Sequence, residues 1–166
     1  MSEIKKKNVL ITGGASGIGK LMCRMCLEQG AAKVIIWDLN LKAMEETAAE
    51  FAKLGKVYYY KVNVSDAKDI ANAYEKTKEE AGYVDILINN AGIVKGNETF
   101  EKQKVSDIQL TMDVNATAPM LVALEILPDM KMRNSGHICN IASAAGMLGV
   151  PRLSVYCASK WAVAGW

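Results

Sequence analysis

The chain has 166 residues; 51% are hydrophobic, 23% are charged, and 20 basic side chains nearly balance 18 acidic ones. A formal net charge of +2 excludes a protein that holds nucleic acid by a large, clustered basic surface. The high apolar content and only 3 prolines exclude an intrinsically disordered chain, and the length is sufficient for one domain with a hydrophobic core.

Short apolar runs alternate along the chain with segments in which apolar residues recur at helical spacing. We predict strands at Asn8–Thr12, Lys33–Trp37, Val57–Val62, Val84–Ile88 and His137–Ile141. We predict helices at 18–30, 41–54, 66–81, 105–132 and from 154 to the end. Five strand–helix units in series predict an α/β fold with parallel strands, right-handed crossovers and helices on both faces. No linker or repeat divides the chain, so we expect residues 1–166 to form a single domain.

Nothing in this pattern predicts export or membrane insertion. Residues 1–7 are few and polar, unlike a signal peptide. The longest apolar run, Met120–Leu127, contains Glu125 and is bounded by Pro119 and Pro128, whereas a membrane-spanning helix needs roughly 18 apolar residues. We therefore expect no integral membrane segment and a cytoplasmic protein with reduced cysteines.

Some residues with the spacing or chemistry of a site have simpler interpretations. Cys23 and Cys26 have redox or zinc spacing, but no second pair and no nearby histidine completes a site, so they are interpreted as small residues on a helix. The only histidine, His137, begins a strand and cannot build a triad, and we predict no metal site. Tyr58-Tyr59-Tyr60 is interpreted as a strand with alternating burial, and Cys157 as a packing residue.

A glycine-rich loop lies between the first strand and the first helix, with the sequence Thr-Gly-Gly-Ala-Ser-Gly-Ile-Gly over 12–19. Glycines there permit a tight turn, let the backbone approach a pyrophosphate and allow close helix–strand packing, while the helix N-terminus attracts the anion. Any tight turn can use glycine, so the loop alone is weak support. Asp38 strengthens it, because it ends the second strand 19 residues after Gly19, near the roughly 20 expected for the acid that binds ribose hydroxyls.

Asp38 also bears on the choice of cofactor. A 2′-phosphate at this position would meet the Asp38 carboxylate, and Ser16, Leu39 and Asn40 offer no cation to offset the repulsion. Lys42 is the nearest cation, and at the start of a helix we expect it to face solvent. The sequence therefore predicts NAD in preference to NADP.

The spacing Gly13-x3-Gly17-x-Gly19 resembles that of the short-chain dehydrogenase/reductase family. The family's other motifs follow in order as Asn89-Asn90-Ala91-Gly92, Asn115, Ser143 and the pair Tyr156-x3-Lys160. The resemblance covers Asn8–Trp166 and implies a Rossmann-type doubly wound sheet and a homodimer or homotetramer. It also implies that the cofactor is bound by the loop and motif residues Gly13, Ser16, Gly17, Ile18, Gly19, Asn90, Ala91 and Gly92.

The catalytic residues of this motif set have a chemical rationale of their own. Tyr156 and Lys160 are one helical turn apart and share a face. A free tyrosine, with a pKa of about 10, is a poor base at neutral pH, and a nearby ammonium and an oxidised nicotinamide lower that pKa. Tyr156 can then exchange the substrate proton while hydride moves to or from the cofactor, and Ser143 can hold the substrate oxygen. The resemblance adds that Lys160 binds the nicotinamide ribose and that Asn115 belongs to a water-linked proton relay.

Each of these residues taken singly has an ordinary structural interpretation. A tyrosine and a lysine at helical spacing are usually an amphipathic surface pair, Ser143 can be a loop residue, and Asn115 can be a hydrogen-bonding residue inside a helix. It is their combination with the nucleotide-binding pattern that favours catalysis.

The adenine end of the predicted site departs from the family pattern. Many members have aspartate where this chain has Asn63, and an amide can donate or accept at the adenine edge. Val64 is expected to supply a backbone contact. Nucleotide binding is expected to survive this change.

Finer similarity points to one branch of the family. The segments concerned are 9–13, Ile36-Trp37-Asp38, Glu46-Thr47-Ala48, Leu127-Pro128, Gly136-His137-Ile138, Ala142–Gly146, Val150-Pro151 and Tyr156–Lys160. They resemble the branch of 17β-hydroxysteroid dehydrogenase type 11 and epidermal retinol dehydrogenase-like enzymes. That resemblance implies a secondary steroid alcohol or retinol as substrate. Members often carry an N-terminal membrane or lipid-droplet anchor, for which a strand beginning at Asn8 leaves no room, although peripheral association stays open.

The sequence thus predicts an NAD-dependent oxidoreductase that interconverts an alcohol and its carbonyl. The alternatives are an NAD-binding sensor or scaffold without turnover, a dehydrogenase of acyloins or short-chain alcohols, and a fragment that does not fold alone. A doubly wound dinucleotide fold ordinarily has a sixth strand, and only five are predicted. We therefore expect the cofactor-binding and catalytic part of a longer enzyme, with its C-terminal substrate-binding segment absent.

Overall fold

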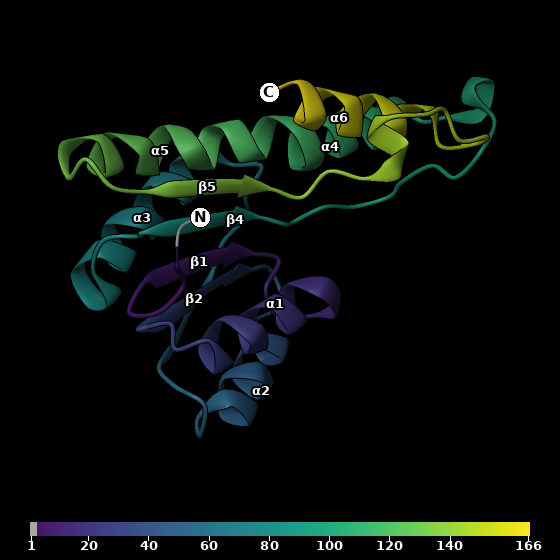
Figure 1. The fold of residues 1–166 in the computed structure, drawn as a ribbon. Coiled ribbons are helices and arrows are strands. Elements are labelled where there is room, and N and C mark those ends of the chain that lie inside the picture. Colours follow the sequence, from purple (N-terminus) through teal and green to yellow (C-terminus); the bar gives the residue numbers. More distant parts are fainter. Residues whose placement is uncertain (1–2) are drawn as a thin grey trace.

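A computed structural model describes residues 3–166 and contains one five-stranded sheet (Figure 1). The strands are β1 (Asn8–Thr12), β2 (Lys33–Asp38), β3 (Val57–Lys61), β4 (Ile86–Asn89) and β5 (His137–Asn140). They are parallel throughout, in the order β3-β2-β1-β4-β5. The order reverses between β1 and β4, and ligands of such sheets bind outside the carboxyl ends of the strands at this switch point. The predicted doubly wound α/β fold is confirmed.

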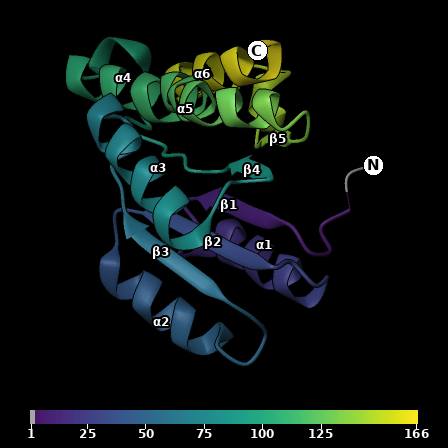
Figure 2. The same ribbon diagram turned by 90° about the vertical axis from the view of Figure 1, so that its left-hand side faces the viewer.

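Helices cover both faces of the sheet, as Figure 2 shows. The α-helices are α1 (Gly17–Glu28), α2 (Leu41–Phe51), α3 (Ala67–Ala81), α4 (Val105–Met112), α5 (Ala118–Met132) and α6 (Ser154–Gly165). One hydrophobic cluster joins the sheet to α1 and α2, and a second joins the opposite face to α3 and α5. Alternate strand residues supply the two clusters: Val9 and Ile11 enter the first, while Leu10 enters the second.

The same alternation explains the tyrosine run and the cysteine pair. Tyr58 and Tyr60 pack against the α3–α5 cluster and Tyr59 against the α1–α2 cluster, which confirms a strand with alternating faces. Cys23 and Cys26 are buried in the α1–α2 cluster as free thiols. Burial raises the pKa of Cys23 to about 12 and also raises that of Cys26, so both are held as thiols in the core.

The main departure from the predicted elements lies in the long helix predicted at 105–132. Between α4 and α5 the chain forms a π-helical segment, η2 (Asp113–Thr117), so the helix is continuous but has a bulge. Short 3₁₀ turns that were not predicted occur at η1 (Phe100–Lys102) and η3 (Ala144–Gly146). The other elements differ by a few residues at their ends, for example α2, which ends at Phe51 rather than Leu54.

Among residues 3–166, one helix is long and apolar enough to cross a membrane, judged by length and composition alone. It is the continuous helix from Val105 to Met132. Glu125 and the prolines do not interrupt this helix, so the apolar run at 120–127 is part of a longer one, and the expectation of no integral membrane segment stays a prediction. In this fold 44% of its most apolar window is buried, and α5 packs on α3 and β4. A core helix passes the same test, so the finding is weak support for a membrane span.

Candidate active site

A cleft of about 400 Å³ opens at the switch point, within the size range of small-molecule sites. All the predicted nucleotide-binding residues other than the Tyr156–Lys160 pair line this cleft: Gly13, Ser16, Gly17, Ile18, Gly19, Asp38, Asn63, Val64, Asn90, Ala91 and Gly92. Residues that sequence reasoning missed also line it, namely Trp37, Leu39, Val62, Ile93 and Val114. Their positions follow from a signal in the sequence, since each lies next to a predicted residue or on the bulged helix.

The glycine loop is open at Gly17, where a ligand could approach the backbone, and closely packed at Gly19, where a side chain would not fit. At Gly17, where φ is +51°, a Cβ would have no heavy atom within 4 Å. At Gly19 a Cβ would overlap the Gly13 carbonyl oxygen and lie 2.6 Å from Asn90 Nδ2. Ser16 caps α1 without a side-chain hydrogen bond, which leaves the first-turn amides available to a phosphate.

The Asp38 carboxylate is fixed at the lip of the cleft by backbone donors. Ala15 N donates to Asp38 Oδ2 at 3.1 Å, and Asn40 N donates to Asp38 Oδ1 at 3.0 Å. Each oxygen keeps a further lone pair, so the carboxylate can still accept from ribose hydroxyls.

The side chain of Asn63 is held in one orientation by Ser65. Asn63 Oδ1 accepts from Ser65 N at 3.2 Å and from Ser65 Oγ at 2.7 Å. Asp69 Oδ2 accepts from Asn63 N at 2.6 Å. Because the amide oxygen is occupied twice, the amide nitrogen is the group left to donate to a ligand in the cleft, a point that the sequence left open.

Asn90 and Thr12 join the loop after β4 to the loop after β1. Asn90 Nδ2 donates to Thr12 O at 2.9 Å and to Gly13 O at 3.2 Å. Thr12 Oγ1 accepts from Asn90 N and Ala91 N, both at 3.0 Å. Thr12, which is buried, was missed; a polar residue that ends an otherwise apolar strand was the signal for it.

Lys160 connects the helix of Tyr156 to the cleft. Its Nζ lies 5.9 Å from the centroid of the Tyr156 ring and donates to Ile141 O at 2.8 Å. A Cβ on Gly92 would lie 3.6 Å from Lys160 Nζ and 3.5 Å from Asn115 Oδ1, so these residues converge. Lys160 is 5% exposed, and burial lowers the pKa of its ammonium.

Ser143 is half-buried at the start of η3, where its Oγ accepts from Ala145 N at 3.2 Å. The turn is pressed against α6, because a Cβ on Gly146 would lie 2.7 Å from Lys160 O. Ser143 therefore follows β5 and lies in a turn that packs on α6, the helix that carries Tyr156. Within residues 3–166 no hydrogen bond links Ser143 directly to Tyr156, and the Tyr156 hydroxyl bonds to no protein atom.

Asn115 lies in η2 and is 1% exposed. Its Oδ1 accepts from Ile93 N and its Nδ2 donates to Ile93 O, both at 2.8 Å, while Nδ2 also donates to Ser159 Oγ at 3.1 Å. Pro119, four residues later, has no N–H to give the Asn115 carbonyl. The bulge therefore occurs where the ordinary helical bond cannot form, and it brings the predicted Asn115 next to Lys160 and Gly92.

A glycine loop and Asp38, the last residue of β2, line a cleft at the switch point, and Lys160 of α6 lies beside Gly92 in its lining. This arrangement is typical of dinucleotide-binding proteins of the doubly wound class. A family model described as short chain dehydrogenase matches residues 7–166, and the chain belongs to the short-chain dehydrogenase family. Estradiol 17-beta-dehydrogenase 11 from Homo sapiens is 42% identical over 158 residues, which make up 95% of this chain and 52% of that protein. The predicted family and branch are confirmed.

Solved structures of the family superimpose closely. A short chain dehydrogenase/reductase from Burkholderia phymatum in complex with NAD has a TM-score of 0.94 at 29% identity, covering 99% of this chain and 59% of that chain. A metagenomic short-chain oxidoreductase in complex with NADP has a TM-score of 0.92 at 27% identity, covering 99% of this chain and 74% of that chain. The chain spans about half the length of the curated relatives it matches.

Proposed function

We propose that this chain is the cofactor-binding and catalytic part of an NAD-dependent oxidoreductase that interconverts an alcohol and its carbonyl. The observation that carries the proposal is the position of Lys160. Its Nζ lies beside the Tyr156 ring and beside Gly92, a residue of the nucleotide-sized cleft. A proton-transfer group and a nucleotide site therefore meet at one point.

The residues of this edge divide the chemistry between them. When bound, the nicotinamide ring supplies the acceptor or donor of hydride. The Tyr156 hydroxyl exchanges the proton with the substrate oxygen, and the Ser143 hydroxyl donates to that oxygen as its charge develops. Lys160 orients the nicotinamide ribose and favours tyrosinate when it is charged. The carbonyl of Asn115, without an N–H from Pro119, is available to hold a water that returns the proton to solvent.

NAD is proposed as the cofactor in preference to NADP. Both Asp38 oxygens stand at the lip of the cleft with lone pairs free for ribose hydroxyls, and a 2′-phosphate would be repelled there. Relatives in complex with either nucleotide exist, so this preference depends on Asp38 alone.

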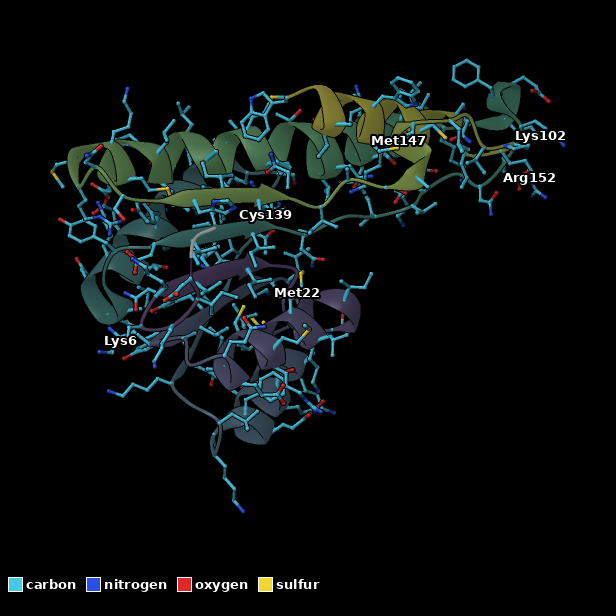
Figure 3. The ribbon with its side chains drawn as sticks, viewed as in Figure 1. Lys6, Met22, Lys102, Cys139, Met147 and Arg152 are labelled. Carbon is cyan, nitrogen blue, oxygen red and sulfur yellow. The ribbon has the colours of Figure 1, made fainter. Side chains whose placement is uncertain are left out.

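The substrate is proposed to be a hydrophobic secondary alcohol, in the class of steroids and retinoids. Figure 3 shows Met147 at the end of the molecule where the loops after β4 and β5 lie. Met147 is 78% exposed, and Leu148 and Val94 on the two loops are also exposed. Apolar side chains beside the catalytic edge suit an apolar substrate, as does the relative named for estradiol.

We propose further that residues 1–166 are one domain of a longer cytoplasmic enzyme whose C-terminal segment completes the substrate site. A homodimer or homotetramer is proposed because exposed apolar residues gather on α4, α5 and α6, among them Val105, Leu124 and Trp161. Peripheral association with a membrane or lipid droplet is compatible with this arrangement.

The test uses the full-length protein with a panel of steroid, retinoid, acyloin and short-chain alcohols, with NAD and NADP compared by absorbance of the reduced cofactor. We expect turnover with NAD and a hydrophobic alcohol, and its loss in Tyr156→Phe with NAD affinity retained. Full activity in Tyr156→Phe would contradict the role of that hydroxyl. Measurable NAD binding without turnover across the panel would favour the sensor or scaffold, and turnover confined to small alcohols would overturn the substrate class.

A further inference from the structure

Ser159 lies on α6 between Tyr156 and Lys160, and its side chain is completely buried. Its Oγ donates to Tyr156 O at 2.7 Å and accepts from Asn115 Nδ2 at 3.1 Å. A serine that bonds back to a carbonyl of its own helix is common. The bond received from Asn115, 44 residues away in sequence, is what sets this serine apart.

The hydrogen bonds continue beyond Asn115 to a third segment. Asn115 Nδ2 also donates to Ile93 O, and Asn115 Oδ1 accepts from Ile93 N, both at 2.8 Å. The two amide hydrogens of Asn115 are thus used by Ser159 and Ile93. One series of buried and part-buried bonds connects the turn of α6 that carries Tyr156, the η2 bulge and the wall of the cleft at Ile93.

Only a hydroxyl satisfies both ends of this connection. The position faces an N–H donor from Asn115 and a carbonyl acceptor at Tyr156, so it needs a group that accepts and donates at once. Alanine offers neither, a thiol offers both weakly, and threonine offers both fully. Because Ser159 and Asn115 are both buried, a missing partner leaves Asn115 with an unsatisfied hydrogen, and the side chain must move to find another.

We propose that Ser159 is a positioning residue that locks the Asn115 carboxamide and thereby sets the Tyr156 turn against the cleft. The inference rests on the proposed function, in which Tyr156 exchanges the substrate proton. Ser159 touches neither substrate nor cofactor in this account. It acts by keeping the reacting groups in register, and small misplacements of such groups cost turnover steeply.

The experiment compares Ser159→Ala, Ser159→Thr and Ser159→Cys in the full-length protein, with Ser154→Ala as the matched control on the same helix at an exposed position. We expect Ser159→Ala to lower kcat by about 100-fold while KM for NAD stays within about twofold. Ser159→Thr should recover kcat to within about threefold, because it retains both hydrogen-bonding functions. Ser154→Ala should behave as wild type.

A second readout needs neither cofactor nor substrate. Hydrogen exchange of the Ile93 amide, which donates to Asn115 Oδ1, should be faster by about tenfold or more in Ser159→Ala and unchanged in Ser159→Thr and Ser154→Ala. Wild-type kcat together with unchanged Ile93 exchange in folded Ser159→Ala would overturn the proposal. If Ser159→Ala does not fold, Ser159→Cys, whose thiol makes both bonds only weakly, should lower kcat and speed Ile93 exchange to a smaller degree, and wild-type values of both would overturn the proposal. Absence of turnover in the wild-type protein would contradict the proposed function. The exchange rate of the Ile93 amide would still test whether Ser159 holds the Asn115 carboxamide in place.

Discussion

Gly19→Ala places one methyl group where the glycine loop has no space for it. The added Cβ would overlap the Gly13 carbonyl and lie 2.6 Å from Asn90 Nδ2. Neither neighbour can retreat freely, because Asn90 Nδ2 donates to Thr12 O and Gly13 O. Overpacking of this kind costs about 1–3 kcal/mol, and the higher helix propensity of alanine returns about 0.5–1 kcal/mol. We expect a net loss of about 1–2 kcal/mol in the free energy of unfolding.

The same shift should weaken nucleotide binding, because the loop proposed to hold the pyrophosphate moves with Gly13. We expect the Kd for NAD to rise about tenfold or more, measured by calorimetric titration, with stability measured by urea unfolding. Gly149→Ala is the matched control, since a Cβ there meets nothing within 4 Å and φ is not positive. If Gly19→Ala matched Gly149→Ala in both stability and NAD affinity, the packing argument for the loop would be refuted.

Two substitutions and one labelling experiment test the ribose position, the Arg133 hydrogen bonds and the cysteine pair. Asp38→Ser removes the carboxylate at the ribose position and should raise the Kd for NAD about tenfold while lowering that for NADP; an unchanged ratio in titrations would contradict the assignment. Arg133→Met removes the hydrogen bonds that Arg133 donates to Asp85 Oδ1 at 2.7 Å and to Val84 O at 2.6 Å. It should lower the free energy of unfolding, measured in urea, by about 2 kcal/mol. The control Lys76→Met, which removes an exposed ion pair, should lower it by less than about 0.5 kcal/mol, and equal losses in the two variants would contradict this reasoning. The Cys23 thiol, with its pKa raised to about 12, should resist a thiol reagent at about pH 8 until the protein unfolds, and rapid labelling would support a redox pair instead.

The Cys23 shift also predicts a pH dependence of stability. The unfolded thiol deprotonates near its ordinary value of 9.0, whereas the folded thiol keeps its proton to about pH 12. Between these values the unfolded state has lost a proton that the folded state retains, so this group's contribution to stability falls as the pH rises from about 9 and is intact below it. Cys23→Ala should flatten that decline in urea unfolding followed between pH 8 and 10.

The fold could be predicted from the sequence because apolar runs and helical spacing report directly on buried strands and amphipathic helices. The residues that line the cleft could be predicted, because glycines and an acid at fixed spacing are what a tight turn and a ribose would require. Their position around one cleft then follows from parallel strands, whose carboxyl ends share one edge.

The η2 bulge could not be predicted from spacing, since apolar periodicity at 105–132 fits a regular helix equally well. Pro119, four residues after Asn115, was the available signal. A proline there has no N–H, so the Asn115 carbonyl lacks the hydrogen bond of a regular helix. Thr12 and Ser159 were missed for another reason. Their roles consist of hydrogen bonds to residues 78 and 44 positions away, which only the packed chain brings together.

The most direct test of the central claim follows the hydrogen itself. The full-length protein is incubated with NAD and a secondary steroid alcohol that carries deuterium on the carbinol carbon, and the reduced cofactor is analysed by mass spectrometry. The proposed hydride transfer predicts one deuterium in the reduced nicotinamide, and no reduced cofactor from Tyr156→Phe although that variant binds NAD. Reduced cofactor without deuterium, or NAD binding with no reduction of the cofactor by any alcohol of the panel, would contradict it.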